Sequence, residues 1–387
     1  MKPVKNNISV LFLGTQMEVA GAQRMLLSQA RWFSRTGYPV QAVFFYDKQG
    51  LIKDWRKENQ FPITSLEARK VNSDPISNAL RLLRSVWRLF SKLRRNVQVI
   101  VTFTPHSNIL GLPIAWLAGV PVRIGTHHGY IEGSSRLFAW VHGRLTNSPI
   151  CSRMVAVSSQ VRDREIKQEG ASSKRVTVIE NGIEPVELRN PTRRLDMRKQ
   201  LGFADDDLVI LTVGRMTIQK GHAYFLDAIS RIESRYPRAR YLFVGDGPLR
   251  SELENQAMTL GISDKVSFLG IRKNVSDLLY IADIFVQPSL WEGLSLALLE
   301  ALMSGLPVLA TRVEGVVDVV EEEKSALLVA PKDPVSLAAA LERLLTDPQL
   351  RIRLSKAGQA LAKENYSIDT MCKSYEQLIL NLVPNVS

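Results

Sequence analysis

Short runs of apolar, largely β-branched residues recur along the chain, and stretches with helical spacing separate them. Continuous apolar runs are typical of strands buried on both faces, so the pattern predicts parallel sheets covered by helices on both sides. In the first half the predicted strands are residues 8–13, 40–45, 97–103, 122–125, 154–157 and 176–179. After a polar stretch at 184–207 the series resumes with 208–213, 241–244, 266–269, 284–287, 308–310 and 326–329. The sequence therefore predicts an α/β protein with two doubly wound domains in tandem.

Two glutamates, Glu292 and Glu300, flank the predicted start of one helix in the second half. Ser295 is a suitable N-cap, the next eight residues are good helix formers, and Gly305 followed by Pro307 is a stop signal. A rise of ~1.5 Å per residue places the two carboxylates on the order of 10 Å apart, with the unpaired N–H groups of the helix start between them. That arrangement suits a ligand with hydroxyl groups at both ends and a phosphate in the middle.

Glycine and two cations follow the first predicted strand of the second half. Gly214 and Arg215 end this strand, and Lys220 comes five residues later, before a predicted helix. In doubly wound sheets ligands bind beyond the carboxyl ends of the strands, where glycine lets the backbone come close. An arginine fork and a lysine charge suit a diphosphate. Taken alone, the segment fits an ordinary solvated loop equally well.

Composition indicates a globular protein whose positive charge is concentrated in one half. The 387 residues are 45% apolar and 23% charged, which allows two hydrophobic cores. Residues 1–183 contain 26 Lys and Arg against 11 Asp and Glu, a net charge of +15, whereas the remainder has 24 against 27, a net of −3. The first half is therefore expected to meet an anionic surface: nucleic acid, anionic lipid or a phosphorylated substrate.

Targeting and cysteine signals predict a cytoplasmic location. The apolar run at 8–13 is too short to span a bilayer and lacks a cleavable signal pattern. The two cysteines, Cys151 and Cys372, give no disulfide framework.

A basic stripe marks the predicted helix at 81–95. Its members recur at intervals of three and four: Arg81, Arg84, Arg88, Lys92 and Arg95. One interpretation is a sheet-covering helix whose basic face is solvated. The other is a helix that lies on the inner face of a membrane, with Trp87 and Phe90 near its edges and the stripe on anionic headgroups.

Taken together, the motifs resemble the retaining glycosyltransferases of family 4, which have two Rossmann-like domains in the GT-B arrangement, with parallel sheets facing a central cleft. The resemblance rests on Gly214-Arg215 with Lys220-Gly221, on residues 245–248 (Gly-Asp-Gly-Pro), and on Glu292-x7-Glu300. In the first half, residues 19–24, 157–158 and 181–184 resemble the family's Gly-Gly-Ala-Glu-Arg, Val-Ser and Asn-Gly-Ile-Asp segments. Matches run from about Gly14 to Tyr375, which is nearly the whole chain.

The resemblance implies a domain for each substrate. Residues 1–183 would form the acceptor-binding domain, against which a C-terminal helix at 366–387 packs, and residues 184–365 would bind a nucleotide-sugar. The donor would be UDP- or GDP-linked, the acceptor a glycan or a lipid-linked hydroxyl, and neither a metal nor another cofactor is expected. Fixed cations and a helix N-terminus can stabilise a diphosphate leaving group by themselves.

The resemblance also assigns roles to single residues. Arg215 and Lys220 would bind the diphosphate, Glu300 the ribose, and Glu292 the donated sugar. His128, next to a glycine at 129, would face that sugar, and His106 is a weaker candidate for lining the cleft. The remaining donor-binding candidates are the loop glycines Gly21 and Gly214, the base-binding segment that starts at Gly270, and the phosphate-capping residues Gly293, Leu294, Ser295 and Leu296.

The sequence departs from the family pattern in its N-terminal loop, and two other functions stay open. Ala20 replaces the first glycine of the Gly-Gly pair and Gln23 replaces glutamate, so this loop is expected to be stiffer or differently bonded. One alternative is a nucleotide-sugar epimerase of the same fold. The other is a basic nucleic-acid-binding protein without enzymatic activity, although the positive half shows no helix-turn-helix, zinc or ribonucleoprotein signature.

Overall fold

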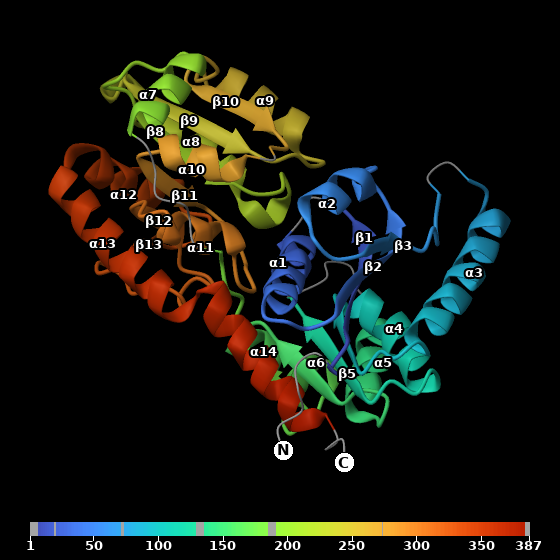
Figure 1. Ribbon diagram of the computed structural model, residues 1–387. Helices are drawn as coiled ribbons and strands as arrows, with labels where there is room; N and C mark the ends of the chain where they lie inside the picture. The colour runs from blue at the N-terminus through green and yellow to red at the C-terminus, as the bar shows by residue number, and fades with distance from the viewer. Residues whose placement is uncertain are drawn as a thin grey trace. The chain divides into compact units, whose positions relative to one another are not determined.

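The computed structural model describes residues 7–18, 21–70, 73–128, 135–184, 191–272 and 274–383, and it divides the chain into two compact α/β units (Figure 1). Unit 1 comprises Met1–Gly182 with Ile368–Ser387, and unit 2 comprises Ile183–Ser367. Each unit holds its own parallel sheet. Two doubly wound domains were predicted from the spacing of apolar runs, and the structure confirms them.

Unit 1 has a seven-stranded sheet in the order β3-β2-β1-β4-β5-β6-β7. Each predicted apolar run overlaps one of its strands, whereas the three-residue edge strand β3 was not predicted because its apolar pattern is too short. The strands are β1 Val10–Met17, β2 Val40–Asp47, β3 Ile63–Ser65, β4 Val99–Phe103, β5 Val122–His127, β6 Arg153–Ala156 and β7 Val176–Val178.

The helices of unit 1 form two layers. Right-handed crossovers between parallel strands place α3 to α6 on one face of the sheet, where α4 packs between α3 and α5, and place α1 and α2 on the other. The C-terminal helix α14 packs on α1, where Trp32 Nε1 donates to Asp369 at 2.6 Å. The helices are α1 Gly21–Arg35, α2 Ile52–Glu58, α3 Pro75–Leu93, α4 Pro105–Leu117, α5 Arg136–Asn147, α6 Ser159–Glu169 and α14 Ile368–Leu382.

Unit 2 repeats the design with six strands in the order β10-β9-β8-β11-β12-β13. Its strands are β8 Leu208–Val213, β9 Ala239–Val244, β10 Val266–Gly270, β11 Ile284–Gln287, β12 Val308–Thr311 and β13 Leu327–Val329. Its helices are α7 Pro191–Gln200, α8 His222–Ser230, α9 Arg250–Thr259, α10 Val275–Ile281, α11 Leu296–Met303, α12 Pro334–Thr346 and α13 Pro348–Asn365, with 3₁₀ turns η2 Ile218–Lys220 and η3 Glu233–Arg235. The order brings β8 and β11 side by side although about 70 residues separate them.

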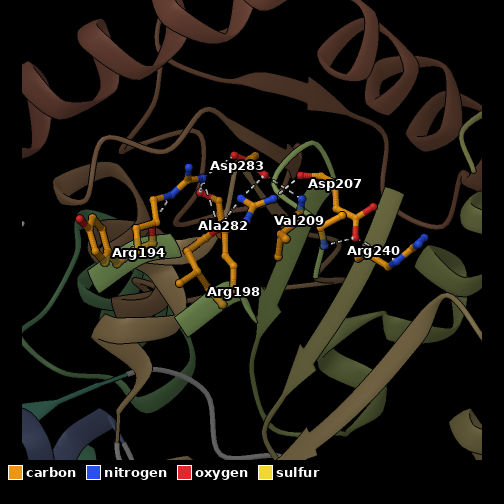
Figure 2. Close-up of polar contacts among 10 residues, drawn as sticks. Arg194, Arg198, Asp207, Val209, Arg240, Ala282 and Asp283 are labelled. Atoms are coloured by element: carbon orange, nitrogen blue, oxygen red, sulfur yellow. Dashed lines mark hydrogen bonds and ion pairs between the residues drawn. The ribbon is translucent and has the colours of Figure 1, made fainter. Parts of the chain in front are cut away.

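Figure 2 shows how two arginines of α7 tie this helix to the amino-terminal ends of β8 and β11. Arg198 is almost fully buried and donates to the Ile281 carbonyl and to Asp283, each at 3.1 Å. Arg194 donates to the other carboxylate oxygen of Asp283 at 2.6 Å, and Asp283 accepts from the Val209 N–H at 2.8 Å. Because this network lies at the edge of the sheet opposite the carboxyl ends, it holds unit 2 together without entering the loops that follow the strands.

Candidate active site

Close backbone approaches bring together the loops that follow β8, β9 and β11 in unit 2. Gly221 has a φ of +62°, and a Cβ atom there would lie 2.0 Å from the carbonyl oxygen of Pro288. A Cβ atom on Gly245, whose φ is +131°, would lie 2.0 Å from the carbonyl oxygen of Gly214. Only glycine fits such contacts, since any side chain would collide with backbone. The carboxyl edge of this sheet is therefore a tightly packed cluster of loops.

Lys220 and Glu292 meet within this cluster. Lys220 Nζ lies 2.5 Å from Glu292 Oε1, and Ser289 Oγ donates to the same carboxylate oxygen at 2.7 Å. The lysine stem passes over Gly214, where a Cβ atom would lie 3.2 Å from the Cγ and Cδ atoms of Lys220. The sequence assigned Lys220 to a diphosphate and Glu292 to a sugar, and the structure pairs these two side chains with each other. Ser289 had not been singled out, although its position just after a strand was a usable signal.

The start of α11 has the predicted form. Ser295 caps the helix, because its Oγ accepts from the Leu298 N–H at 3.3 Å and donates to Gln287 Oε1 at 2.7 Å. The helix begins at Leu296, and Gly293 and Leu294 precede the cap. Glu300 lies inside the helix and is buried. The helix start and the two glutamates thus occupy the places that their spacing predicted.

Arg215 differs from Lys220 in its surroundings. Its side chain is exposed, and it forms no ion pair with any residue in the described part of unit 2. Arg215 is thus a cation at the carboxyl edge that no carboxylate of the described residues neutralises.

Gly270 ends β10 with a φ of +68°, and a Cβ atom there would lie 3.1 Å from Arg250 Nη1.

In unit 1, His128 follows β5 and is partly exposed. The Thr126 hydroxyl donates to the Thr102 carbonyl at 2.9 Å, so the 2.9 Å contact between Thr126 Oγ1 and His128 Nε2 requires His128 to be the donor. Burial and the neighbouring His127 lower the pKa of His128 to about 3. His128 is therefore neutral near pH 7, and its Nδ1 remains a hydrogen-bond acceptor. It can accept a hydrogen bond from a hydroxyl group, but it does not act as an acid.

A buried network that sequence reasoning missed lies next to His128. His142 Nδ1 is 2.6 Å and His127 Nε2 is 3.2 Å from the carboxylate of Glu169. Burial raises the pKa of Glu169, but the hydrogen bonds from the two histidines outweigh this and bring it to about 2. Burial lowers the pKa of His127, and the facing glutamates outweigh it, so the net shift is upward. No local motif links these residues, which lie 15 and 42 positions after His127.

The same three residues have ligating atoms within 4.8 Å of one another, a spacing that could hold a metal ion. The hydrogen bonds of Asn108 fix the tautomer of His142. The Asn108 amide accepts from Thr102 and donates to the Thr126 carbonyl at 3.0 Å, so its N–H must also face His142 Nε2, 2.9 Å away. His142 therefore carries its proton on Nδ1, directed at Glu169, and a metal on Nδ1 would need that proton on Nε2 instead. The geometry fits a hydrogen-bonded network rather than a metal site.

Two further candidates lie in unit 1. Gly21 is the exposed first residue of α1, and the rest of the predicted N-terminal loop, residues 19–20, is outside the described residues. His106 lies in α4, where its ring centroid is 5.0 Å from that of Phe138. The glycine at 129, which suggested His128 as the sugar-facing histidine, also lies outside the described residues. The structure therefore gives Gly21 and His106 no contact that defines a role.

Sequence comparisons identify the family. Residues 193–361 match the family described as glycosyl transferases group 1, and residues 20–182 match the glycosyl transferase 4-like domain. The chain is a glycosyltransferase with a group 1 domain and a glycosyl transferase 4-like domain. The loops at the carboxyl edge of unit 2, with Lys220, Glu292 and the α11 start, lie inside the first of these matches.

Individual relatives agree with this family. The glycosyltransferase is 25% identical, over 100% of both chains, to the UDP-Gal:α-D-GlcNAc-diphosphoundecaprenol α-1,3-galactosyltransferase of Escherichia coli. It is 36% identical to the lipopolysaccharide core biosynthesis glycosyltransferase LpsD of Rhizobium meliloti, over 47% of this chain and 52% of LpsD.

Solved structures share the fold, two Rossmann-like α/β domains of the GT-B class. Anabaena Alr3699/HepE in complex with UDP-glucose superposes with a TM-score of 0.84 at 22% identity, covering 97% of this chain and 100% of that one. WaaG, a glycosyltransferase involved in lipopolysaccharide biosynthesis, gives a TM-score of 0.75 at 19% identity, with 96% and 99% covered. At these identities the likeness establishes the fold.

Proposed function

We propose that this enzyme transfers a sugar from a nucleotide-sugar to a hydroxyl of a glycan or lipid-linked acceptor, with retention of the anomeric configuration. The observation that carries the proposal is the carboxyl edge of unit 2, which gathers two cations, two buried glutamates and a capped helix start. The E. coli relative is named for a UDP-galactose donor and a diphosphoundecaprenol-linked acceptor. Its full-length match supports a donor and an acceptor of these classes.

In the proposed donor complex, Arg215 and Lys220 bind the diphosphate. The N–H groups of Gly293 to Leu296 add the partial positive charge of the helix start, where anions are stabilised. Glu300 accepts from the ribose hydroxyls and Glu292 from the sugar, and the segment from Gly270 to Arg272 borders the base. A UDP-linked donor is favoured over a GDP-linked one, because Alr3699/HepE binds UDP-glucose and the E. coli relative is named for UDP-galactose.

The proposed chemistry depends on stabilising the negative charge of the diphosphate leaving group. When the bond between the sugar and the diphosphate breaks, negative charge grows on the leaving phosphate, and fixed cations with a helix N-terminus stabilise it without a metal. Gly21 is proposed to belong to a loop over the phosphates. His128 is proposed to hold a sugar hydroxyl through Nδ1, since it is neutral and its Nε2–H is directed at Thr126.

A donor screen followed by product analysis tests the proposal. UDP-, GDP- and ADP-sugars are compared by thermal shift at one concentration, since a ligand that binds more tightly raises the melting temperature further. Nuclear magnetic resonance of the product of the stabilising donor then reports the anomeric configuration. Lys220→Ala and Glu300→Ala are expected to lose donor use with the fold intact. Wild-type turnover in both variants would reject the site, and conversion of the donor sugar without an acceptor would favour an epimerase.

A further inference from the structure

Two contacts within unit 1 hold the ring of His128, and each fixes a different aspect of it. The ring stacks on Phe103, the last residue of β4, with the ring centroids 5.4 Å apart and the planes 20° apart. This contact sets the plane of the imidazole. The 2.9 Å contact between Nε2 and Thr126 Oγ1 sets which edge of the ring faces the sheet. Neither of these contacts uses Nδ1.

The hydroxyl of Thr126 determines which nitrogen of His128 carries the proton. Thr126 and Thr102 lie on the neighbouring strands β5 and β4, and both are fully buried. A hydroxyl has one proton, and that of Thr126 goes to the Thr102 carbonyl at 2.9 Å. Rotating the hydroxyl toward His128 would give up this bond, so the observed pattern makes two hydrogen bonds where the alternative makes one. The proton of His128 therefore lies on Nε2.

The backbone of Thr126 is held in turn by Asn108 of α4. The Asn108 amide nitrogen donates to the Thr126 carbonyl at 3.0 Å, and its oxygen accepts from the Thr102 hydroxyl at 2.6 Å. A carbonyl only accepts, so turning the amide over would set its oxygen against the oxygen of Thr126. The same nitrogen faces His142 Nε2, 2.9 Å away. The buried His–Glu–His network thus ends at the backbone carbonyl of the residue that orients His128.

We propose that Thr126 is a positioning residue for sugar transfer, which directs the proton of His128 to Nε2 and leaves Nδ1 to accept a hydrogen bond from a sugar hydroxyl. This inference rests on the proposed function, in which His128 holds the sugar. It also gives the buried network a role, because Asn108 connects that network to Thr126 and so fixes the place of the hydroxyl that His128 contacts.

The tautomer of His128 is measured on the full chain without any substrate. The protein is made with ¹⁵N-labelled histidine, and two-bond ¹H–¹⁵N correlation spectra distinguish a protonated ring nitrogen from one with a lone pair. The chain has five histidines, so His128→Ala identifies the His128 signals. In the wild type we expect the proton of His128 on Nε2. A proton on Nδ1 would overturn the proposal by itself.

Three variants separate orientation from packing. Thr126→Val nearly keeps the volume of the side chain but removes the acceptor, so we expect the proton of His128 to move to Nδ1. Thr126→Ser restores the hydroxyl and should restore the wild-type tautomer. Thr102→Val is the matched control, because it makes the same change at a fully buried position and keeps the backbone carbonyl that accepts from Thr126. It should leave the His128 tautomer unchanged.

The signals of His142 report whether the buried network of unit 1 is intact. His142 should keep its proton on Nδ1, which faces Glu169, in all three variants. A disturbed His142 signal in Thr126→Val would contradict the proposal, because a positioning residue of this kind acts on His128 alone.

Turnover then measures the consequence for sugar transfer. The assay is release of UDP from UDP-galactose, the donor for which the E. coli relative is named. Loss of one neutral hydrogen bond to the sugar should lower kcat/KM about fivefold in Thr126→Val, and Thr126→Ser should recover it. An equal loss in Thr102→Val, or an unchanged tautomer in Thr126→Val, would overturn the proposal. Wild-type turnover in His128→Ala would instead reject the proposed role of His128 at the sugar, whereas the control of its tautomer by Thr126 would stand.

Discussion

Replacing Glu292 by glutamine is expected to tighten the binding of UDP while it lowers sugar transfer. In the structure Lys220 Nζ is held 2.5 Å from Glu292 Oε1, with the two side chains only 19% and 5% exposed. A diphosphate that recruits Lys220 must weaken this ion pair. Glutamine keeps the shape of the side chain and removes its charge, so the lysine becomes available to the phosphates while the carboxylate that would hold the sugar is lost.

The expected magnitude follows from the contact. Glutamine keeps a hydrogen bond from the Lys220 ammonium, which stays charged, but it loses the attraction between opposite charges, which contributes ~1 kcal/mol in a partly exposed pair. Removing about 1 kcal/mol of this competition corresponds to about fivefold in the dissociation constant of UDP. Ser289 Oγ also contacts the Glu292 carboxylate at 2.7 Å and anchors position 292 in both proteins, so the loop itself is not expected to move.

Isothermal titration calorimetry with UDP measures the dissociation constant, and two further variants serve as comparisons. Glu300→Gln should weaken UDP binding, because Glu300 is proposed to hold the ribose. Glu322→Gln makes the same charge change on the surface of unit 2, where Glu322 pairs with Arg312, and should leave UDP binding unchanged. Unchanged or weaker UDP binding in Glu292→Gln would refute the idea that the ion pair competes with the diphosphate.

Three further changes test other parts of the molecule. Gly221→Ala should lose donor binding, because its Cβ would lie 2.0 Å from a carbonyl oxygen of the loop after β11, whereas Gly202→Ala, with a similar φ of +77° and open space, should keep it; titration with UDP compares them. Arg198→Met should lower the free energy of unfolding in urea by about 3 kcal/mol, because it breaks a buried pair with Asp283, and UDP affinity should not change. Burial raises the pKa of Glu165 from 4.5 to about 7, so its contribution to stability is full below the lower value and is lost as the pH rises through the upper one. Glu165→Gln should flatten that loss in urea unfolding measured across this pH range, and an unchanged slope would contradict the assignment.

Local signals predicted the elements that carry the proposed donor site. The twelve apolar runs all overlap strands, and α11 begins at Leu296 after the Ser295 cap and ends at Met303, as the stop signal at Gly305 indicated. Such signals work because a cap, a helix former or a buried strand run acts within a few residues of itself. The basic stripe of α3 was also visible, but the inward turn of Lys92 was not, since it depends on Gln41 of a strand about 50 residues away.

Side-chain pairing across the sheets needed the tertiary structure. Lys220 and Glu292 are 72 residues apart and meet because β8 and β11 are neighbours in the sheet, an order that no local pattern encodes. His142 and Glu169 reach His127 in the same way, from α5 and α6, which pack against each other.

By itself the sequence determined the two-domain α/β architecture, the family and the residue types available for chemistry, because hydrophobic spacing, caps and glycine motifs are local properties. Only the tertiary structure decided which charges face one another: the lysine expected at the phosphates is held by the glutamate expected at the sugar, and His128 is held neutral beside a buried His–Glu–His network. Partners in an ion pair or a hydrogen bond are set by strand order and helix packing, which join segments far apart in the chain.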